Sequence, residues 1–284
     1  DDVRSLLERP WAILGSCRTL TAMLIRIYVT GRVTIEYDSR LIEQDVFPGK
    51  QGLLAFVRLL CTREVAVSRE ELAAVVWPET LPRAWDAALN AIASKLRVLL
   101  ARAGLKKSSV LEAGLGCYRL NLPSDTWVDI EVATDALHKA EGLLKAGSQR
   151  EAWSMAQVAY HILKRPFLPG ESGDWAAQQR ERLSTGFVRA GECLAEIYIW
   201  NGEPSVAADV AEQVIAAQPF RETGYQLLMR AYAAAGNRAA ALRVYERCRK
   251  LIADELGVTP SQETIAVHLE VLHGDRRSGP SARA

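Results

Sequence analysis

One predicted helix carries the side chains of this sequence that are best suited to recognise another molecule. Between residues 83 and 103, apolar residues recur at the spacing of one helix face: Trp85, Ala88, Leu89, Ile92, Leu96, Leu99 and Leu100. The opposite face carries polar and small residues: Arg83, Ala87, Asn90, Ala91, Ser94, Lys95, Arg97 and Ala101. Asparagine can pair with base edges and arginine with guanine or phosphate. This face suits a DNA groove, although the same pattern also occurs on an ordinary solvated helix surface.

Two strands and a helix are predicted upstream of this face. Residues 24–30 and 32–37 are rich in β-branched and aromatic residues and are separated by Gly31, which favours strands. The next apolar residues follow helical spacing within residues 51–62: Leu53, Leu54, Phe56, Val57 and Leu60. These elements are expected to supply the core against which the later helices pack.

A second helix begins at a capping box. The Ser68 hydroxyl can accept a hydrogen bond from a free amide of the first turn, and Glu71 can reach back to the N-cap amide. This helix is predicted to run to Val76 and to end before Pro78. The helix of residues 83–103 follows after a short loop. Two helices in this order predict a helix-turn-helix.

A β-hairpin is predicted after the third helix. Residues 110–113 and 117–122 have strand composition, a Gly-Leu-Gly turn at 114–116 joins them, and Pro123 closes the segment. A strand pair, three helices and a C-terminal hairpin together make a winged helix. In that fold the third helix enters the major groove, and the hairpin lies along the DNA backbone or the minor groove.

Three segments resemble the winged-helix domain of OmpR-type response regulators, in the version of the Streptomyces antibiotic regulatory protein family: REELAAVVWPE, ALNAIASKLRVLLARAG and GLGCYRLNLP. The resemblance places four residues in the DNA-reading helix: Asn90, Ser94, Lys95 and Arg97. It places Arg119 in the wing. Arg83, on the same helix face, joins these candidates. The family's reading helices are often richer in arginine, which implies modest affinity at one site and compensation by dimers or neighbouring sites.

The chain beyond Pro123 has the composition and period of a helical repeat. Four residues return at an offset of 34, so that Leu194, Tyr198, Gly202 and Ala207 reappear as Leu228, Tyr232, Gly236 and Ala241. The tetratricopeptide period is about 34 residues, with Gly ending the first helix and Ala allowing the second to pack closely. An incomplete earlier copy contains Leu143, Gly147, Ala152 and Ala156. A long helix over residues 175–200 is expected between the copies.

Two segments of this part resemble the bacterial transcriptional activator domain that follows the winged helix in the same family: RPFLPGESGDWAAQQRERL and PFRETGYQLLMRAYAAAGNRAAALRVYERCRKLIADELGVTPSQET. Together the two resemblances span residues 24–272. They imply a winged helix that binds direct repeats near a promoter and a helical domain that supports dimerisation and recruitment of RNA polymerase holoenzyme. Homodimerisation and a small-molecule effector stay open at this point.

A different function class remains an alternative, namely a tetratricopeptide-type adaptor or a small-molecule sensor. In that interpretation these residues line a groove for a partner or ligand: Tyr198, Tyr225, Tyr232, Arg243 and Arg247. Aromatic residues at such positions more often belong to the core between helices, and such arginines more often form a solvated helix face. DNA binding through phosphates must weaken steeply with salt, whereas adaptor binding need not.

Composition and charge exclude several other classes. With 49% hydrophobic and 24% charged residues the chain is expected to be globular, and its apolar runs fall short of the ~18 residues of a membrane span. The five cysteines are scattered, and we expect no metal, no cofactor, no catalytic constellation and a cytoplasmic protein. Residues 1–122 carry 17 Lys and Arg against 13 Asp and Glu, and residues 123–284 carry 18 against 21. The slight positive excess therefore lies on the predicted DNA-binding side.

We therefore predict a mainly α protein that binds promoter DNA sequence-specifically and activates transcription. An α+β winged helix-turn-helix domain covers residues 23–123, and an all-α tetratricopeptide-like activator domain covers 124–273. Residues 1–22 are expected to be an extension of unknown role, and 274–284 a disordered tail. Replacing Arg97 with alanine is expected to cost about 1–3 kcal/mol of specific DNA binding and to leave the fold intact.

Overall fold

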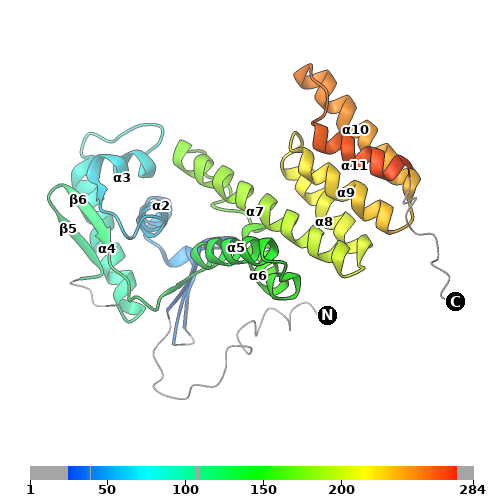
Figure 1. The fold of residues 1–284 in the computed structure, drawn as a ribbon. Coiled ribbons are helices and arrows are strands. Elements are labelled where there is room, and N and C mark those ends of the chain that lie inside the picture. The colour runs from blue at the N-terminus through cyan, green and yellow to red at the C-terminus, as the bar shows by residue number, and fades with distance from the viewer. Residues whose placement is uncertain (1–24, 39, 106–108, 274–284) are drawn as a thin grey trace, which may run out of the picture.

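The computed structural model describes residues 25–38, 40–105 and 109–273 and arranges them in two packed parts (Figure 1). We name residues 25–128 the winged part and residues 129–273 the helical array. The first part mixes strands and helices, and the described second part consists of helices and their connections. The prediction of a mainly α protein is thus confirmed. Our expectations for 1–22 and 274–284 concern residues outside the described ranges.

A four-stranded sheet lies in the winged part. Its strands are β1 (Arg26–Tyr28), β2 (Thr34–Tyr37), β3 (Arg40–Ile42) and β7 (Trp127–Val128). Their order is β3-β2-β1-β7, in which β1 pairs antiparallel with β2 and parallel with β7. Sequence patterning predicted only the first two, because β3 and β7 are too short to show an alternation. β7 comes from beyond Pro123, so the sheet crosses the predicted domain boundary.

A helical core and a second sheet complete the winged part. The elements are η1 (Gln44–Val46), α2 (Gly49–Leu60), β4 (Val67–Ser68), α3 (Arg69–Val76), α4 (Trp85–Arg102), β5 (Leu111–Gly114) and β6 (Cys117–Leu120). The second sheet has the order β4-β6-β5. The predicted capping box is present, since the Glu71 amide donates to Ser68 Oγ over 3.1 Å and the Ser68 amide donates to Glu71 Oε2 over 3.2 Å.

The buried stripe of α4 follows the predicted period with two differences. Leu89, Leu96, Leu99 and Leu100 are buried as expected, and Ala93 joins them because it lies one turn beyond Leu89. Trp85, Ala88 and Ile92 are only half-buried at the edge of the stripe. The helix begins at Trp85 rather than at Arg83. The assignment of Arg83 to the helix face was therefore wrong, and this residue lies in the preceding turn.

The helical array contains seven helices among the described residues. They are α5 (Asp129–Lys145), α6 (Gln149–Leu163), α7 (Asp174–Trp200), α8 (Pro204–Ala217), α9 (Glu222–Ala234), α10 (Arg238–Leu256) and α11 (Gln262–His273). Figure 1 shows consecutive helices packed side by side in pairs. The long helix expected over residues 175–200 is α7.

Glycine and alanine build the turns and contacts of these pairs. Gly147, Gly202 and Gly236 have φ values of +75°, +78° and +74°, which L side chains rarely adopt, and each ends the first helix of a pair. Three alanines lie at equivalent places in the second helices and are 0% exposed: Ala152, Ala207 and Ala241. The repeat read from the sequence is therefore present three times, and the copy that looked incomplete forms the full pair α5–α6.

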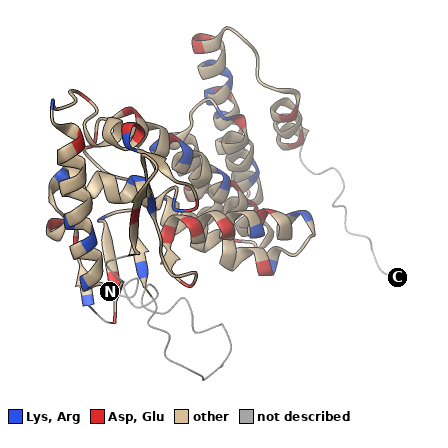
Figure 2. Ribbon diagram, turned by 90° about the vertical axis from the view of Figure 1, so that its left-hand side faces the viewer, with Lys and Arg blue, Asp and Glu red and all other residues tan. Residues whose placement is uncertain are grey.

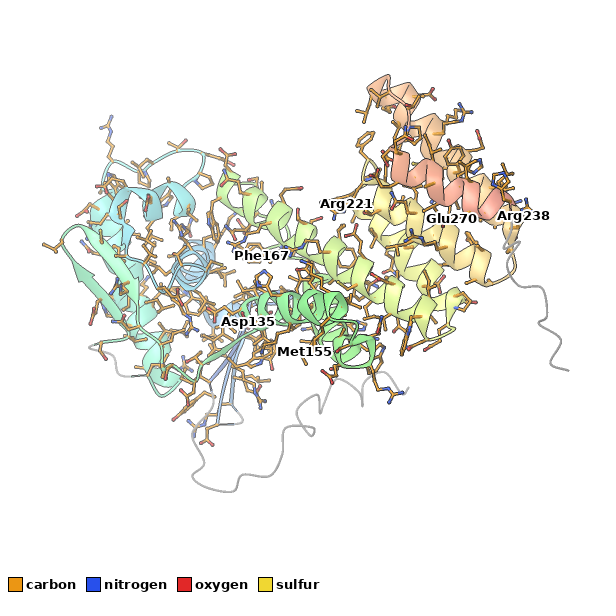
Figure 3. All side chains as sticks on the ribbon, viewed as in Figure 1. Asp135, Met155, Phe167, Arg221, Arg238 and Glu270 are labelled. Atoms are coloured by element: carbon orange, nitrogen blue, oxygen red, sulfur yellow. The ribbon has the colours of Figure 1, made fainter. Side chains whose placement is uncertain are left out.

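The two parts share an extensive contact. Phe167, on the connection between α6 and α7, is buried in the core of the winged part and bridges Thr30 in antiparallel fashion, as its place between the parts in Figure 3 shows. Lys50 of α2 pairs with Glu171 over 2.9 Å, and Arg63 pairs with Glu131 of α5 over 2.6 Å. These contacts join the winged part to the helical array.

The described residues set two further limits. No helix among them is long and apolar enough to cross a membrane. Within the same ranges, no three His, Cys, Asp or Glu side chains are grouped to hold a metal ion.

Candidate nucleic-acid interface

The outward face of α4 is the best candidate for contact with nucleic acid. Asn90, Ser94 and Lys95 are all exposed on it, and Ala87 and Ala91 between them are exposed as well. Because both alanines are small, a partner surface can approach the helix backbone closely. The structure thus brings three of the predicted residues together on one open face.

Arg69, which the sequence did not single out, holds two residues of α4 in place. Arg69, the first residue of α3, donates from Nε to the Asp86 carboxylate over 2.8 Å and from Nη2 to the same carboxylate. Its Nη1 donates to Asn90 Oδ1 over 3.3 Å. The Arg69 side chain is only 19% exposed. The capping box located Arg69 at the helix start, but no sequence pattern indicated that it reaches the neighbouring helix.

Tyr118 of β6 extends the same network to the hairpin of β5 and β6, which we name the wing. Its hydroxyl accepts from Arg69 Nη1 over 3.1 Å and donates to Asn90 Oδ1 over 2.9 Å. Burial raises the pKa of Tyr118, so its hydroxyl stays protonated at neutral pH. The Arg69 amide also donates to the Gly116 carbonyl of the wing over 3.0 Å. Helix α3, helix α4 and the wing therefore hold one another in place.

Arg97 differs from its sequence-based interpretation. It is half-buried, and its Nε donates to the Leu111 carbonyl of β5 over 2.8 Å. Arg97 lies off the buried stripe of α4 as expected, but it also binds the wing, so we now expect its replacement to weaken that contact. The physical reason is that the wing returns to the end of α4, a contact between residues 14 positions apart. Arg97 anchors the wing while lying beside the candidate face.

The wing presents Arg119 and an apolar tip. Arg119 is exposed and lies opposite Glu112 in the β5–β6 register. Leu115 at the tip is fully exposed at 104% of its reference area. Figure 2 shows acidic and basic residues interspersed on the side that the winged part presents to the viewer. The candidate interface therefore carries separate cations among acidic residues and is not uniformly basic.

The predicted groove in the helical array is not formed as expected. Tyr225 is 2% exposed and lies beneath Arg247, whose guanidinium is 5.3 Å from the ring centre, so its assignment as a groove residue was wrong. Arg247 itself pairs with Glu212 over 3.0 Å. Tyr198 is half-buried, and its hydroxyl accepts from Gln157 over 2.5 Å. Tyr225 is buried because its ring fills the space between α9 and its neighbours.

The two remaining residues of that groove differ in exposure. Tyr232 is half-buried and packs on the core of the array, whereas Arg243 on α10 is exposed. The five groove candidates therefore do not form one open surface.

The helical array matches the family model of the bacterial transcriptional activator domain over residues 128–272. The regulatory protein AfsR of Streptomyces coelicolor is 30% identical over 228 residues, which cover 80% of this chain and 22% of AfsR. The transcriptional regulatory protein EmbR of Mycobacterium tuberculosis is 27% identical over 231 residues, covering 79% of this chain and 58% of EmbR. The transcriptional regulator RedD of Streptomyces coelicolor is 29% identical over 218 residues, covering 74% and 60%. The chain spans less than two thirds of each relative.

Among solved structures, Mycobacterium tuberculosis EmbR in complex with a low-affinity phosphopeptide matches with a TM-score of 0.80 and 23% identity, covering 88% of this chain and 65% of that one. This likeness shows the fold, a winged helix followed by a helical array. The relatives are named as regulators, which agrees with the expectation that the chain is not an enzyme. Because the family model matches half of the chain and the relatives agree with it, this protein belongs to the bacterial transcriptional activator domain family, among the Streptomyces antibiotic regulatory proteins.

Proposed function

We propose that this chain is a transcription activator that binds promoter DNA sequence-specifically through α4 and the wing and recruits RNA polymerase holoenzyme. One observation carries the proposal, namely the exposed polar face of α4 braced from behind by α3 and the wing. A recognition helix must hold its side chains at fixed places, because base edges are read by hydrogen bonds of defined direction.

The shape of α4 supports insertion into a major groove. Asn90, Ser94 and Lys95 offer hydrogen-bond donors and a positive charge on the same side as the small Ala87 and Ala91. A helix fits the major groove when its outward side chains do not hold its backbone away from the bases. The wing lies beside this face and carries Arg119, which suits contact with a phosphate.

Electrostatics supports modest affinity at a single site. Asp86 lies on α4 close to the candidate face, but its charge is paired with Arg69. Lys95 and Arg119 are exposed and can approach phosphates. With so few cations, neighbouring sites or a second copy of the chain would add the affinity that one copy lacks.

The helical array is the part of the chain to which we assign the contacts with partner proteins. We assign DNA binding to residues 23–123 and activation to residues 124–273, and we infer that the array contacts RNA polymerase or a second copy. The relatives are named transcriptional regulators, which supports a role in the cytoplasm at promoters. In this proposal a small-molecule effector would act by changing the contacts that the helical array makes.

The test begins with DNA retained by the purified protein. Fragments of its own genome that bind are sequenced, and the affinity for the enriched site is measured across salt concentrations. DNA binding through phosphates is expected to give a log–log slope of about −0.9 per contacted phosphate. Lys95→Ala is expected to make the slope less negative by about one contact. The matched control is Lys139→Ala, an exposed lysine of α5 in the helical array, which should leave the slope unchanged.

Two results would contradict the proposal. One is retention of no DNA, or of DNA with no salt dependence, which would favour the adaptor or sensor alternative. The other is an equal change of slope for the Lys95 and Lys139 variants, because a general loss of charge would then explain both.

A further inference from the structure

Asn90 is a polar side chain on the candidate face whose amide orientation is fixed from within the protein. Its Oδ1 accepts from the Tyr118 hydroxyl over 2.9 Å and from Arg69 Nη1 over 3.3 Å. A carbonyl oxygen has two lone pairs, and both are occupied here. Asn90 is nevertheless exposed, because it lies on the outward face of α4.

The chemistry of arginine decides which atom of the amide points inward. A guanidinium has only donors, so the atom that faces Arg69 must be the oxygen and the opposite atom must be the nitrogen. The Tyr118 hydroxyl fits the same orientation, because it accepts from Arg69 and uses its own proton toward Asn90. An inverted amide would place Nδ2 against a guanidinium donor.

Arg69 is itself held too firmly to turn away. Its Nε donates to the Asp86 carboxylate over 2.8 Å, and its Nη2 donates to the Asp86 backbone carbonyl over 3.3 Å. Its guanidinium carbon lies 5.2 Å from the Tyr118 ring centre, and that ring is 1% exposed. The acceptor of Asn90 is therefore occupied by rigid neighbours before any partner arrives.

Within the described part of the chain, Nδ2 of Asn90 donates to no acceptor, so it is the group that remains for a partner. Resting on the DNA-binding function proposed above, we propose that Asn90 reads DNA as a donor only and selects a base edge that presents acceptors. In the major groove guanine presents two acceptors, O6 and N7, and thymine presents O4, whereas adenine places a donor, N6, beside its N7 acceptor.

The same geometry disfavours the other two bases. The usual asparagine contact with adenine needs the amide oxygen to accept from N6 while the nitrogen donates to N7, and this oxygen has no lone pair left. A single donation to N7 would leave the adenine N6 donor without its acceptor on Asn90, so adenine is bound more weakly than guanine. Cytosine presents only the N4 donor at this edge, which would face another donor. Asn90 thus discriminates between bases because Arg69 and Tyr118 occupy its oxygen and leave only its Nδ2 donor for DNA.

The proposal is tested by selecting binding sites from a pool of random DNA duplexes with the full chain and three variants. Asn90→Ala identifies the position that Asn90 reads, since base preference is lost there alone. The unchanged protein is expected to select guanine or thymine at that position. Replacing that guanine with 7-deazaguanine, or that thymine with an analogue lacking O4, should weaken binding about fivefold, and should not weaken binding by Asn90→Ala.

Two further variants separate the donor from the acceptor. Asn90→Asp keeps one oxygen for Arg69 and Tyr118 and turns a second oxygen outward, so the preferred base should change to one that presents a donor at this edge, cytosine through N4 or adenine through N6. Tyr118→Phe frees one lone pair of Oδ1, so adenine should become acceptable at the same position and nowhere else. Circular dichroism and urea unfolding verify that each variant is folded, and Asn90→Asp keeps the test decisive if Tyr118→Phe is not.

Each outcome decides a different question. Adenine or cytosine at the position read by Asn90 in the unchanged protein, or no change of preference in Asn90→Ala, would overturn the donor-only inference while leaving DNA binding intact. Failure of the unchanged protein to select any sequence would overturn the proposed function instead.

Discussion

The Asp129 carboxylate accepts a hydrogen bond from the Thr30 hydroxyl over 2.7 Å and another from the Thr30 amide over 3.0 Å, across 99 positions of sequence. The amides of Val29 and Ile130 donate to the same carboxylate over 3.0 Å and 2.8 Å. Asp129 is 0% exposed. The first residue of the helical array thus satisfies the donors at the end of β1 and joins the two parts.

Replacing Asp129 with alanine is expected to lower the free energy of unfolding by about 3 kcal/mol, because three amides and a hydroxyl lose their acceptor in a buried place. Asp129→Asn should also lower stability, since it keeps one acceptor oxygen but places its Nδ2 donor against backbone amides that also donate. Burial raises the pKa of Asp129, and the hydrogen bonds from Thr30, Val29 and Ile130 oppose that shift. Urea unfolding measures the difference. Asp125→Ala, an exposed aspartate four residues away, is the control and should change little.

The contrast between Ser68 and Asp129 shows what the sequence could predict about the fold. The Ser68–Glu71 box, the hairpin glycines and the repeat of 34 residues all act between near neighbours, so local patterns were enough to identify them. Two of the residues that Asp129 binds, Val29 and Thr30, follow a distant strand, and no local pattern indicates them. The same holds for β7, whose two residues form a strand only because β1 is available to pair with them.

The candidate site divides in the same way. Helical periodicity correctly turned Asn90, Ser94 and Lys95 outward, because exposure on a helix follows from spacing. It could not predict that Arg69 would orient the Asn90 amide, nor that Arg97 would bind the wing, since both contacts join separate elements. Which residues are outward was therefore predictable, and what each one can offer a partner was not.

Arg97→Ala is expected to affect both the wing and DNA binding. Losing the hydrogen bond to the Leu111 carbonyl should lower the free energy of unfolding by about 1 kcal/mol and increase amide hydrogen exchange in β5. Lys95→Ala, which removes an exposed cation from the same helix, should not change exchange in β5. Equal exchange in both variants would show that the Arg97 contact does not hold the wing.

Leu115→Asn is expected to stabilise the wing. Leu115 and Gly116 have φ values of +51° and +74°, the signs of a type I′ turn, and a leucine tolerates the first of these poorly. Asparagine adopts this conformation more readily, so the free energy of unfolding should rise by about 0.5–1 kcal/mol. Thermal unfolding of both proteins tests this expectation, and a lower stability of the asparagine variant would contradict it.

His268 is expected to make the end of the helical array sensitive to acid. Its ring stacks on Tyr245 with centres 3.8 Å apart, and its Nδ1 is buried with no hydrogen-bond partner among the described residues. Burial lowers the pKa of His268 below 6.5, and Glu246 opposes that shift. A lowered histidine pKa means that the unfolded chain binds the proton more readily, so this contribution to stability is present above pH 6.5 and is lost as the pH falls.

The sensitivity is measured by urea unfolding at several pH values between 5 and 8. His268→Phe keeps a stacked ring without a titrating group, so its stability should fall less on acidification than that of the unchanged protein. His138→Gln changes an exposed histidine of α5 and serves as the control. If the His268 and His138 variants respond to acid alike, the half-buried ring of His268 is not the source of the effect.

Two glycines inside helices should respond in opposite directions to alanine. A Cβ on Gly191 of α7 would lie 2.5 Å from Val214 Cγ2 of α8, whereas a Cβ on Gly142 of α5 would meet nothing within 4 Å. Gly191→Ala is therefore expected to lower the free energy of unfolding by about 1–3 kcal/mol through crowding of two helices. Gly142→Ala should raise it by about 0.5–1 kcal/mol, since alanine restricts the unfolded chain. Urea unfolding of both variants compares the same chemical change in two settings, and a rise in stability for both would show that helix propensity alone, rather than the close approach of α7 and α8, governs these positions.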